Sequence, residues 1–409
     1  MNFRTKLPFL ICTIVVILFL GFLLSDLRSF DGDELGTFND IKKIHKPIPY
    51  AKIVLSWIKF LEPINISDIF FLRLSSLFFT ILTILLWFIF SIKSKFESIL
   101  YFIITVTSCF LLSQTIYFRY YSYYLLSSTV IFFFLTTSIK QLSTNLKLLA
   151  CLIGLMITPF LFHILNGIQF GVYFLYVLLF EKIKYLKIRL VIIALLFLMI
   201  ISIVINPSLI WSFFNWLNII EALNINTQTS DLHGLNIRVL IKPIYAVYQM
   251  IFGFDLAPTD SLTIIILAIF FFLLLLIQTY KLFTFDKKMF FEYLIIGIVP
   301  FLIIYLFFQT ISFPGFTQLE TKHGILVYPV LLSVIIKSHN YLSKPTFIIS
   351  FSSIIIFQLI GTYNSFTKSN TDWNYVLKKI DNYYALSEKP NILMDGRSYQ
   401  PFKFYNQKN

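Results

Sequence analysis

Long apolar runs recur along the whole chain. Many of them have roughly 18 to 25 residues, the length that a helix needs to cross a hydrocarbon core of about 30 Å. Of the 409 residues, 58% are hydrophobic and only 13% are charged, which is about half the charged share of a soluble protein. The runs are continuous rather than alternating, so a transmembrane β-barrel is excluded. The sequence predicts an all-α, polytopic membrane protein with about 11 to 12 transmembrane helices.

One segment stands apart from the clear spans. Residues 239–254 contain Lys242, Pro243 and Gln249, so we expect this segment to lie at the membrane interface or to form a broken helix, and whether it spans stays open. We assign residues 1–363 to a transmembrane domain and residues 364–409 to a short outward tail. The predicted spans are residues 7–24, 68–92, 98–116, 120–139, 146–162, 167–180, 190–205, 262–280, 290–309, 324–336 and 347–363.

Basic residues gather in alternate connections between these spans, which sets the predicted orientation. The positive-inside rule makes their side cytoplasmic, so the N-terminus faces the cytoplasm while loop 25–67, loop 206–261 and the tail face outward from the cell membrane. Topology thus accounts for the net charge of +13, and no nucleic-acid partner is expected. The basic residues on the predicted cytoplasmic side are Arg4, Lys6, Lys93, Lys95, Lys140, Lys147, Lys182, Lys184, Lys187, Arg189, Lys281, Lys287, Lys288, Lys337 and Lys344.

The first outward loop carries three clustered carboxylates, Asp31, Asp33 and Glu34, just beyond the first span. One interpretation is a hydrated turn that caps a helix, because Asp and Glu favour helix N-termini. The other is a general base or a metal-binding pair at the membrane surface, because clustered carboxylates raise one another's pKa. Further on, Arg73 lies just inside the second span, where an arginine usually faces a polar cavity or an anion.

Several short motifs follow one another in a recognisable order. They are the Asp33-Glu34 pair, His45-Lys46-Pro47 before an amphipathic stretch, Arg73-Leu74-Ser75-Ser76, Ser113-Gln114 to Arg119-Tyr120 to Tyr123, His163, Lys322-His323-Gly324 and Asp372-Trp373. In this order they resemble the polyprenol-phosphate-dependent glycosyltransferases of the membrane-embedded C superfamily, especially glycosyltransferase family 39, which includes protein O-mannosyltransferases and aminoarabinose transferases. The chain departs from the family where Lys46 replaces a proline, Ile164 an aromatic residue and Lys322 an arginine.

The resemblance implies an enzyme that transfers a hexosyl or pentosyl group from a polyprenyl-phosphate donor to a lipid, glycan or protein acceptor on the outer face of the membrane, with inversion. Asp33, and next Glu34, would be the catalytic base. Arg73, Arg119 and Lys322 would bind the donor phosphate. Asp31, His45, Tyr120, Tyr123, His163 and His323 would contact substrate. The spacing does not identify a metal site and we assign no cofactor, although these hard ligands are compatible with a divalent cation.

Simpler interpretations stay open beside these roles. Arg119 and its tyrosines also fit an interfacial aromatic belt, His163 an interfacial polar residue, and Lys322 a lysine that extends to the headgroups. The alternative functions are a polymerase or ligase of lipid-linked glycans, which would share the donor, and a flippase. A flippase usually carries ionisable residues at mid-span, whereas here they concentrate at span ends.

The predicted orientation has a direct test. In a background without the native cysteines, Asn39→Cys should be labelled from outside intact cells by a membrane-impermeant thiol reagent, because loop 25–67 faces outward. Lys288→Cys, on the predicted cytoplasmic side, should be labelled only after permeabilisation. The reverse pattern would invert the topology.

Overall fold

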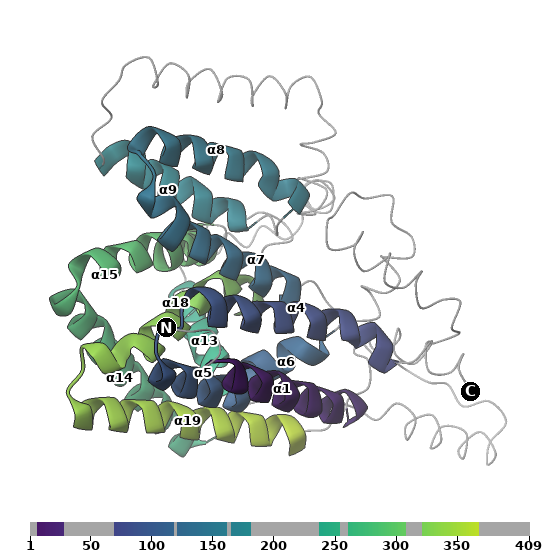
Figure 1. The fold of residues 1–409 in the computed structure, drawn as a ribbon. Helices are drawn as coiled ribbons and strands as arrows, with labels where there is room; N and C mark the ends of the chain where they lie inside the picture. Colours follow the sequence, from purple (N-terminus) through teal and green to yellow (C-terminus); the bar gives the residue numbers. More distant parts are fainter. Residues whose placement is uncertain are drawn as a thin grey trace, which may run out of the picture.

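The computed structural model describes residues 6–27, 69–117, 121–161, 165–180, 237–253, 261–307 and 321–367 (Figure 1). Every regular element within these residues is helical, so the predicted all-α class is confirmed for this part of the chain. Six of these helices are long and apolar enough to cross a membrane, or up to seven if one bent pair counts as a single span. The predicted span 190–205 lies outside the described residues.

The helices follow the predicted runs closely. Shorter apolar helices stand at three of the predicted spans, Thr144–Thr158, Asn166–Phe180 and Gly324–Asn340. The helices are α1 (Leu7–Leu27), α4 (Ile69–Phe90), α5 (Lys95–Thr107), α6 (Cys109–Ile116), α7 (Tyr121–Phe133), α8 (Thr144–Leu161), α9 (Asn166–Phe180), α13 (Ile237–Phe252), α14 (Leu262–Phe285), α15 (Lys287–Tyr293), α16 (Val299–Leu302), α18 (Tyr328–Lys337) and α19 (Lys344–Thr367). Short π turns (Phe134–Ser138, Leu294–Ile298, Ile303–Phe307) and 3₁₀ turns (Ile139–Gln141, Thr321–Val327, Ser338–Asn340) extend or join them.

Helix α1 shows how an apolar helix is divided between protein and lipid. Its Leu10, Ile17 and Leu24, spaced seven residues apart, are almost fully buried, whereas Val15 and Phe19 on the other side are more than half exposed. The narrow buried stripe contacts α4, α5 and α6. A helix that is apolar all round satisfies both environments, since lipid and protein interior are equally apolar.

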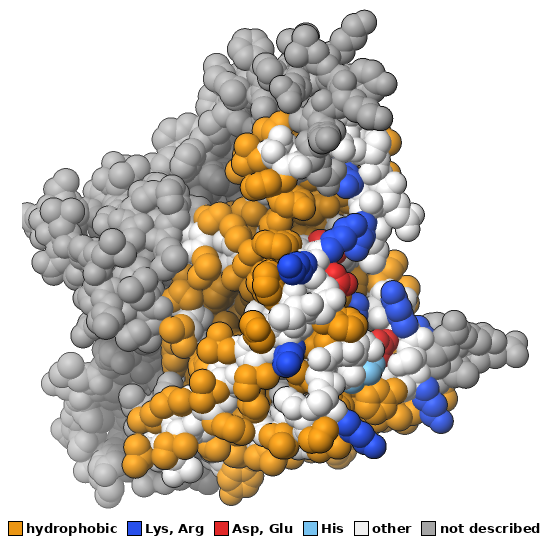
Figure 2. Space-filling model, turned by 90° about the vertical axis from the view of Figure 1, so that its left-hand side faces the viewer, with side chains coloured by type: hydrophobic (Ala, Val, Ile, Leu, Met, Phe, Trp, Pro, Cys, Tyr) orange, Lys and Arg blue, Asp and Glu red, His pale blue; other side chains and the backbone are white. Residues whose placement is uncertain are grey.

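The long helices lie side by side, and the α8–α9 pair packs on α7 at one edge of the bundle (Figure 1). The connections between helices that carry most of the described lysines meet at one end of the bundle. Lys6 donates a hydrogen bond to the carbonyl of Ile92, and Lys140 forms an ion pair of 3.0 Å with Glu292. We term this the lysine-rich end; Figure 2 shows its lysines among hydrophobic side chains. The lysines of the described connections there are Lys6, Lys93, Lys95, Lys140, Lys147, Lys281, Lys287, Lys288, Lys337 and Lys344.

The predicted span 98–116 is bent rather than straight. Helices α5 and α6 meet at Ser108, whose backbone is extended, and their axes differ by 60°. Ser108 caps α6, since its hydroxyl accepts from the amide of Leu111 at 3.2 Å. The Thr107 carbonyl at the end of α5 accepts a hydrogen bond of 2.8 Å from Thr362 of α19. Backbone groups that the bend releases therefore find partners within the bundle, as an apolar medium requires.

Helix α13 covers most of residues 239–254 and corrects one of the two expectations for them, the broken helix. It is one continuous helix despite Pro243, and its second half is packed inside the bundle against α6, α19 and the turn Thr321–Val327. The side chains of Tyr248, Met250 and Phe252 are at most 2% exposed. The described residues thus form a continuous rather than a broken helix, and its second half is enclosed by protein.

The end of α13 is held between two other helices. Gly361 of α19 lies so close that a Cβ atom there would be 2.0 Å from the carbonyl oxygen of Phe252. Gly253, which follows α13, has a φ of +88°, and a Cβ there would be 2.9 Å from Sγ of Cys109. Glycine at both positions permits a close approach of α6, α13 and α19, in the way that small residues do in membrane proteins.

Gly361→Ala should therefore destabilise the protein by about 1 to 3 kcal/mol, because the neighbouring atoms are backbone and must move. The loss would be measured as a lower midpoint of thermal unfolding in detergent. Gly171→Ala is the matched control, since a Cβ there meets its nearest neighbour, Leu155, at 4.0 Å and gains the same helix propensity. Equal midpoints for the two variants would contradict the close approach.

Candidate functional site

The end of the bundle opposite the lysine-rich end holds the described candidate residues. We term it the Arg73 end; it comprises the end of α1, the start of α4, and the junction between α6 and α7. Arg73 lies in the second turn of the 22-residue α4, so a rise of about 1.5 Å per residue places it roughly 25 Å from Phe90. Arg73 thus lies near the opposite end of α4 from the lysines.

Arg73 is deeply buried, with 3% of its surface exposed. The neighbouring Ser75 and Ser76 are also buried, and the Ser76 hydroxyl donates a 2.7 Å hydrogen bond to the carbonyl of Tyr117. This bond ties the start of α4 to the segment that leads into Arg119. Arg73 already interacts with other groups of the protein. Ionisable residues within membrane spans are rare and often mark functional sites.

Tyr123 lies between α4 and α7 at the same end. Its ring packs edge to face on Phe79, with centroids 5.2 Å apart, and its hydroxyl donates a hydrogen bond to the carbonyl of Leu161 at the end of α8. Tyr117 and Tyr121 stack nearby at 5.9 Å. These contacts give Tyr123 a structural role at the α7–α8 contact, in addition to its predicted contact with substrate.

The backbone of Lys322 and His323 lies in the 3₁₀ turn Thr321–Val327 that leads into α18. Seven residues are long for a 3₁₀ helix, whose hydrogen bonds are less favourable than those of an α-helix. The turn is held close to the preceding span, since a Cβ at Gly324 would be 2.6 Å from the Phe301 ring and 2.9 Å from the Tyr305 ring. The predicted phosphate-binding lysine is thus attached to a tightly packed segment.

The other predicted site residues lie outside the described residues. The structure therefore does not test whether the acidic loop, the tyrosines and the histidines meet Arg73. Among the residues that it does describe, no three His, Cys, Asp or Glu side chains gather in a manner suited to a metal ion. The predicted residues outside this part of the chain are Asp31, Asp33, Glu34, His45, Arg119, Tyr120 and His163.

A buried polar network next to this end was not predicted. Asn166 accepts from Ser127 at 2.6 Å and donates to Ser128 and Gln169, each at 2.9 Å. Gln169 in turn donates to the carbonyl of Ile296, in the π turn Leu294–Ile298, at 3.1 Å. The network links α7, α9 and this turn inside an apolar bundle. An Asn and a Gln three residues apart in an apolar run are the sequence signal that could have indicated it.

Two further buried polar atoms stand near the Arg73 end without a hydrogen-bond partner among the described residues, Oε1 of Gln114 and Oγ of Ser122. Buried polar groups are nearly always paired, so such atoms indicate a place for water or for a polar ligand. Both belong to the segment that the sequence analysis singled out, Ser113 to Tyr123.

No protein-family model matches the chain, and no curated protein or solved structure matches it. The Arg73 end combines a buried cation, buried hydroxyl groups and tightly packed backbone.

Proposed function

We propose that the protein is a membrane glycosyltransferase that moves one sugar from a polyprenyl-phosphate donor to an acceptor on the outer face of the membrane. The observation that carries the proposal is the burial of Arg73 at the end of the bundle opposite the lysines. Lysines that set topology belong at the cytoplasmic side, so a buried arginine at the other side needs a different reason. Binding of a donor phosphate at the outer surface is the role that we propose for Arg73, because guanidinium groups bind phosphate with paired hydrogen bonds.

Chain connectivity supports the choice of Asp33 as the base. Helix α1 ends at Leu27 and packs against α4 and α6, so its end belongs to the Arg73 end. Asp33 follows six residues later, and an extended chain covers at most about 3.6 Å per residue. Asp33 is thus tethered within roughly 20 Å of the end of α1.

The proposed reaction is a single displacement. The Asp33 carboxylate takes the proton from the acceptor hydroxyl as its oxygen forms a bond to the anomeric carbon. The bond between that carbon and the phosphate oxygen breaks, the configuration inverts, and polyprenyl phosphate leaves with the bonding electrons. Arg73, with Arg119 and Lys322 as further cations, stabilises the charge that develops on the leaving phosphate. One base is sufficient for this course, in contrast to the two carboxylates of retaining hydrolases.

A flippase for lipid-linked glycans is the second candidate, and the bend between α5 and α6 favours it. Broken helices near mid-depth are typical of transporters, where the released backbone groups bind substrate or ions. Here, however, the released groups are satisfied within the bundle, by Thr362 and by Ser108 itself. A polymerase or ligase of lipid-linked glycans would use the same kind of donor and the same cations.

Asp33→Asn should abolish sugar transfer while leaving expression and membrane insertion unchanged, because it removes the base and keeps the shape. The measurement is transfer of radiolabelled sugar from a panel of polyprenyl-phosphate sugars in membranes that contain either variant. Asp286→Asn, at the lysine-rich end, is the control and should transfer normally. Near-normal transfer by Asp33→Asn would refute the assigned role. Protein-dependent movement of labelled lipid without transfer would support the flippase.

Arg73→Gln should raise KM for the donor and lower kcat/KM by roughly 10- to 100-fold, because a charged hydrogen bond to phosphate is lost. Arg73→Lys keeps the charge but loses the paired hydrogen bonds. Its kcat/KM should lie between that of the wild type and that of Arg73→Gln. Thermal unfolding of each purified variant separates a folding defect from a binding defect. An unchanged KM in a variant that folds normally would remove Arg73 from the donor site.

A further inference from the structure

A half-open apolar groove of about 240 Å³ runs between α13, α14, α18 and the span that begins with α15. Nothing in the proposed transfer reaction uses it. The exposed side chains of Ile244 and Leu302 mark its opening, where the groove faces away from the bundle. It is lined by Pro243, Ile244, Val247, Phe272, Leu275, Thr279, Leu282, Phe290, Tyr293, Ile298, Phe301, Leu302, Val327, Val330, Leu331 and Val334.

The lining indicates an occupant with a hydrocarbon chain. Apart from Thr279 and Tyr293 the side chains are apolar, and the Thr279 hydroxyl is already bonded to the carbonyl of Leu275 at 2.7 Å. Tyr293 is likewise bonded to Ser333. The groove therefore offers a ligand few hydrogen-bonding groups. It lies within predicted spans, where acyl chains are the surrounding medium.

One end of the groove leads directly to lysines. Phe290 and Val334 line it, and Lys287 and Lys337 lie three residues from them, on the same helix faces and one turn nearer the lysine-rich end. Nζ of Lys287 lies 5.6 Å from the centroid of the Phe283 ring, which in turn lies 5.1 Å from that of Phe290. Both lysines therefore lie one helical turn beyond the apolar lining, at the lysine-rich end.

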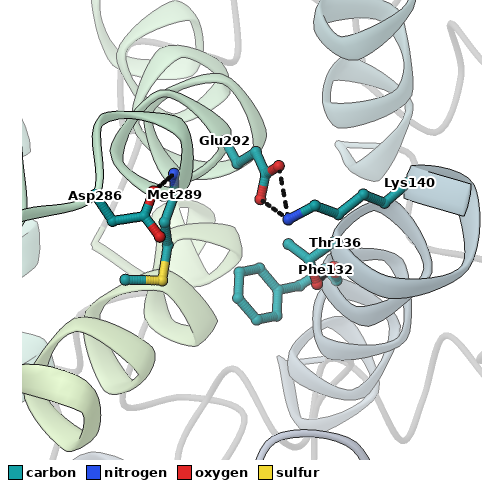
Figure 3. A network of polar contacts seen from close by, with 6 residues as sticks. All are labelled: Phe132, Thr136, Lys140, Asp286, Met289 and Glu292. Carbon is teal, nitrogen blue, oxygen red and sulfur yellow. Dashed lines mark hydrogen bonds and ion pairs between the residues drawn. The ribbon is translucent and has the colours of Figure 1, made fainter. Parts of the chain in front are cut away.

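The carboxylates near these lysines are already engaged (Figure 3). Glu292 pairs with Lys140, and Asp286 caps α15 by accepting from the amide of Met289 at 2.9 Å. Glu97 accepts from the amides of Lys93 and Ser94 in the cap of α5. The described residues at the lysine-rich end include ten lysines and three acidic residues, so this end has a net positive charge.

Lys337 follows the predicted span 324–336 and lies near two other lysines and two glutamates. Burial lowers the pKa of its ammonium group, and the nearby Lys93 lowers it further. Glu97 and Glu292 act in the opposite direction, and Lys140 again lowers the pKa. A phosphate beside Lys337 would offset these costs by stabilising the charged form.

We propose that the groove and the two lysines bind an anionic phospholipid of the leaflet at the lysine-rich end, with one acyl chain in the groove and the phosphate on Lys287 and Lys337. Charge complementarity selects this occupant, because basic clusters beside transmembrane helices retain anionic headgroups. The bilayer supplies the lipid at all times. The site is independent of the proposed transfer reaction, whose described arginine, Arg73, lies at the other end of the bundle.

The test uses the purified full-length protein in micelles that contain either dioleoyl phosphatidylglycerol or dioleoyl phosphatidylcholine. Native mass spectrometry counts the bound lipids, and thermal unfolding reports stabilisation. Phosphatidylglycerol should be retained roughly tenfold better than phosphatidylcholine. Lys287→Gln with Lys337→Gln should reduce this preference to about one, while Lys287→Arg with Lys337→Arg should preserve it and show that the fold tolerates change there.

Matched variants separate the groove from the general surface. Ile244→Trp places a bulky side chain at the opening and should reduce retention of both lipids severalfold, whereas Ile269→Trp, on the exposed side of α14, should not. Lys95→Gln with Lys344→Gln removes two lysines away from the groove and should leave the preference intact. Equal retention of the two lipids by the wild type would overturn the proposal. Displacement of phosphatidylglycerol by equimolar farnesyl phosphate would also overturn it, in favour of an isoprenoid chain as the occupant.

Discussion

The hydrocarbon core of a bilayer solvates neither charges nor unpaired backbone groups, and the described structure follows from that constraint. Charged side chains gather at the two ends of the bundle, while the helices between them are apolar on nearly all sides. Some polar side chains within the bundle satisfy one another, as in the network around Asn166, and Gln169 satisfies a backbone carbonyl of an irregular turn at Ile296. At the bend after Thr107 and at the turn Leu294–Ile298, a neighbouring helix supplies a partner for the irregular backbone.

The two ends carry different kinds of cation. At the lysine-rich end the ammonium groups lie on flexible stems, mostly in contact with solvent, and a small number of carboxylates cap helices or pair with them. At the Arg73 end a guanidinium is enclosed by protein. A hydrated lysine suits orientation in the membrane and loose contact with headgroups, whereas an enclosed arginine suits recognition of a phosphate with fixed geometry. This contrast, more than the number of charges, separates the two faces.

Much of the helical framework could be predicted from the sequence, because apolar runs and flanking lysines report span positions directly. The bend at Ser108 could not, because Thr107, Ser108 and Cys109 interrupt the apolar run only mildly and the bend depends on Thr362, far along the chain. The burial of α13 was also missed, since Lys242, Pro243 and Gln249 favour an interfacial segment when read locally. At the site, the sequence places Arg73 at the start of a span. Its burial depends on packing among α1, α4, α6 and α7 and could not be predicted. The acidic loop lies outside the described residues, and its role stays a prediction.

The hydrogen bond from Thr362 to the Thr107 carbonyl joins residues 255 positions apart, and this separation has a consequence for biogenesis. Synthesis at about 5 to 20 residues per second brings α19 to the ribosome roughly 10 to 50 s after α5. During that interval the Thr107 carbonyl at the end of α5 lacks its hydrogen-bond donor, and α13 lacks one of the two helices that enclose its end. The nascent chain must therefore keep this region near water, or near the insertion machinery, until its last described helix arrives. Maturation of the bundle is a late event, set by the slowest-arriving helix rather than by the insertion of each span.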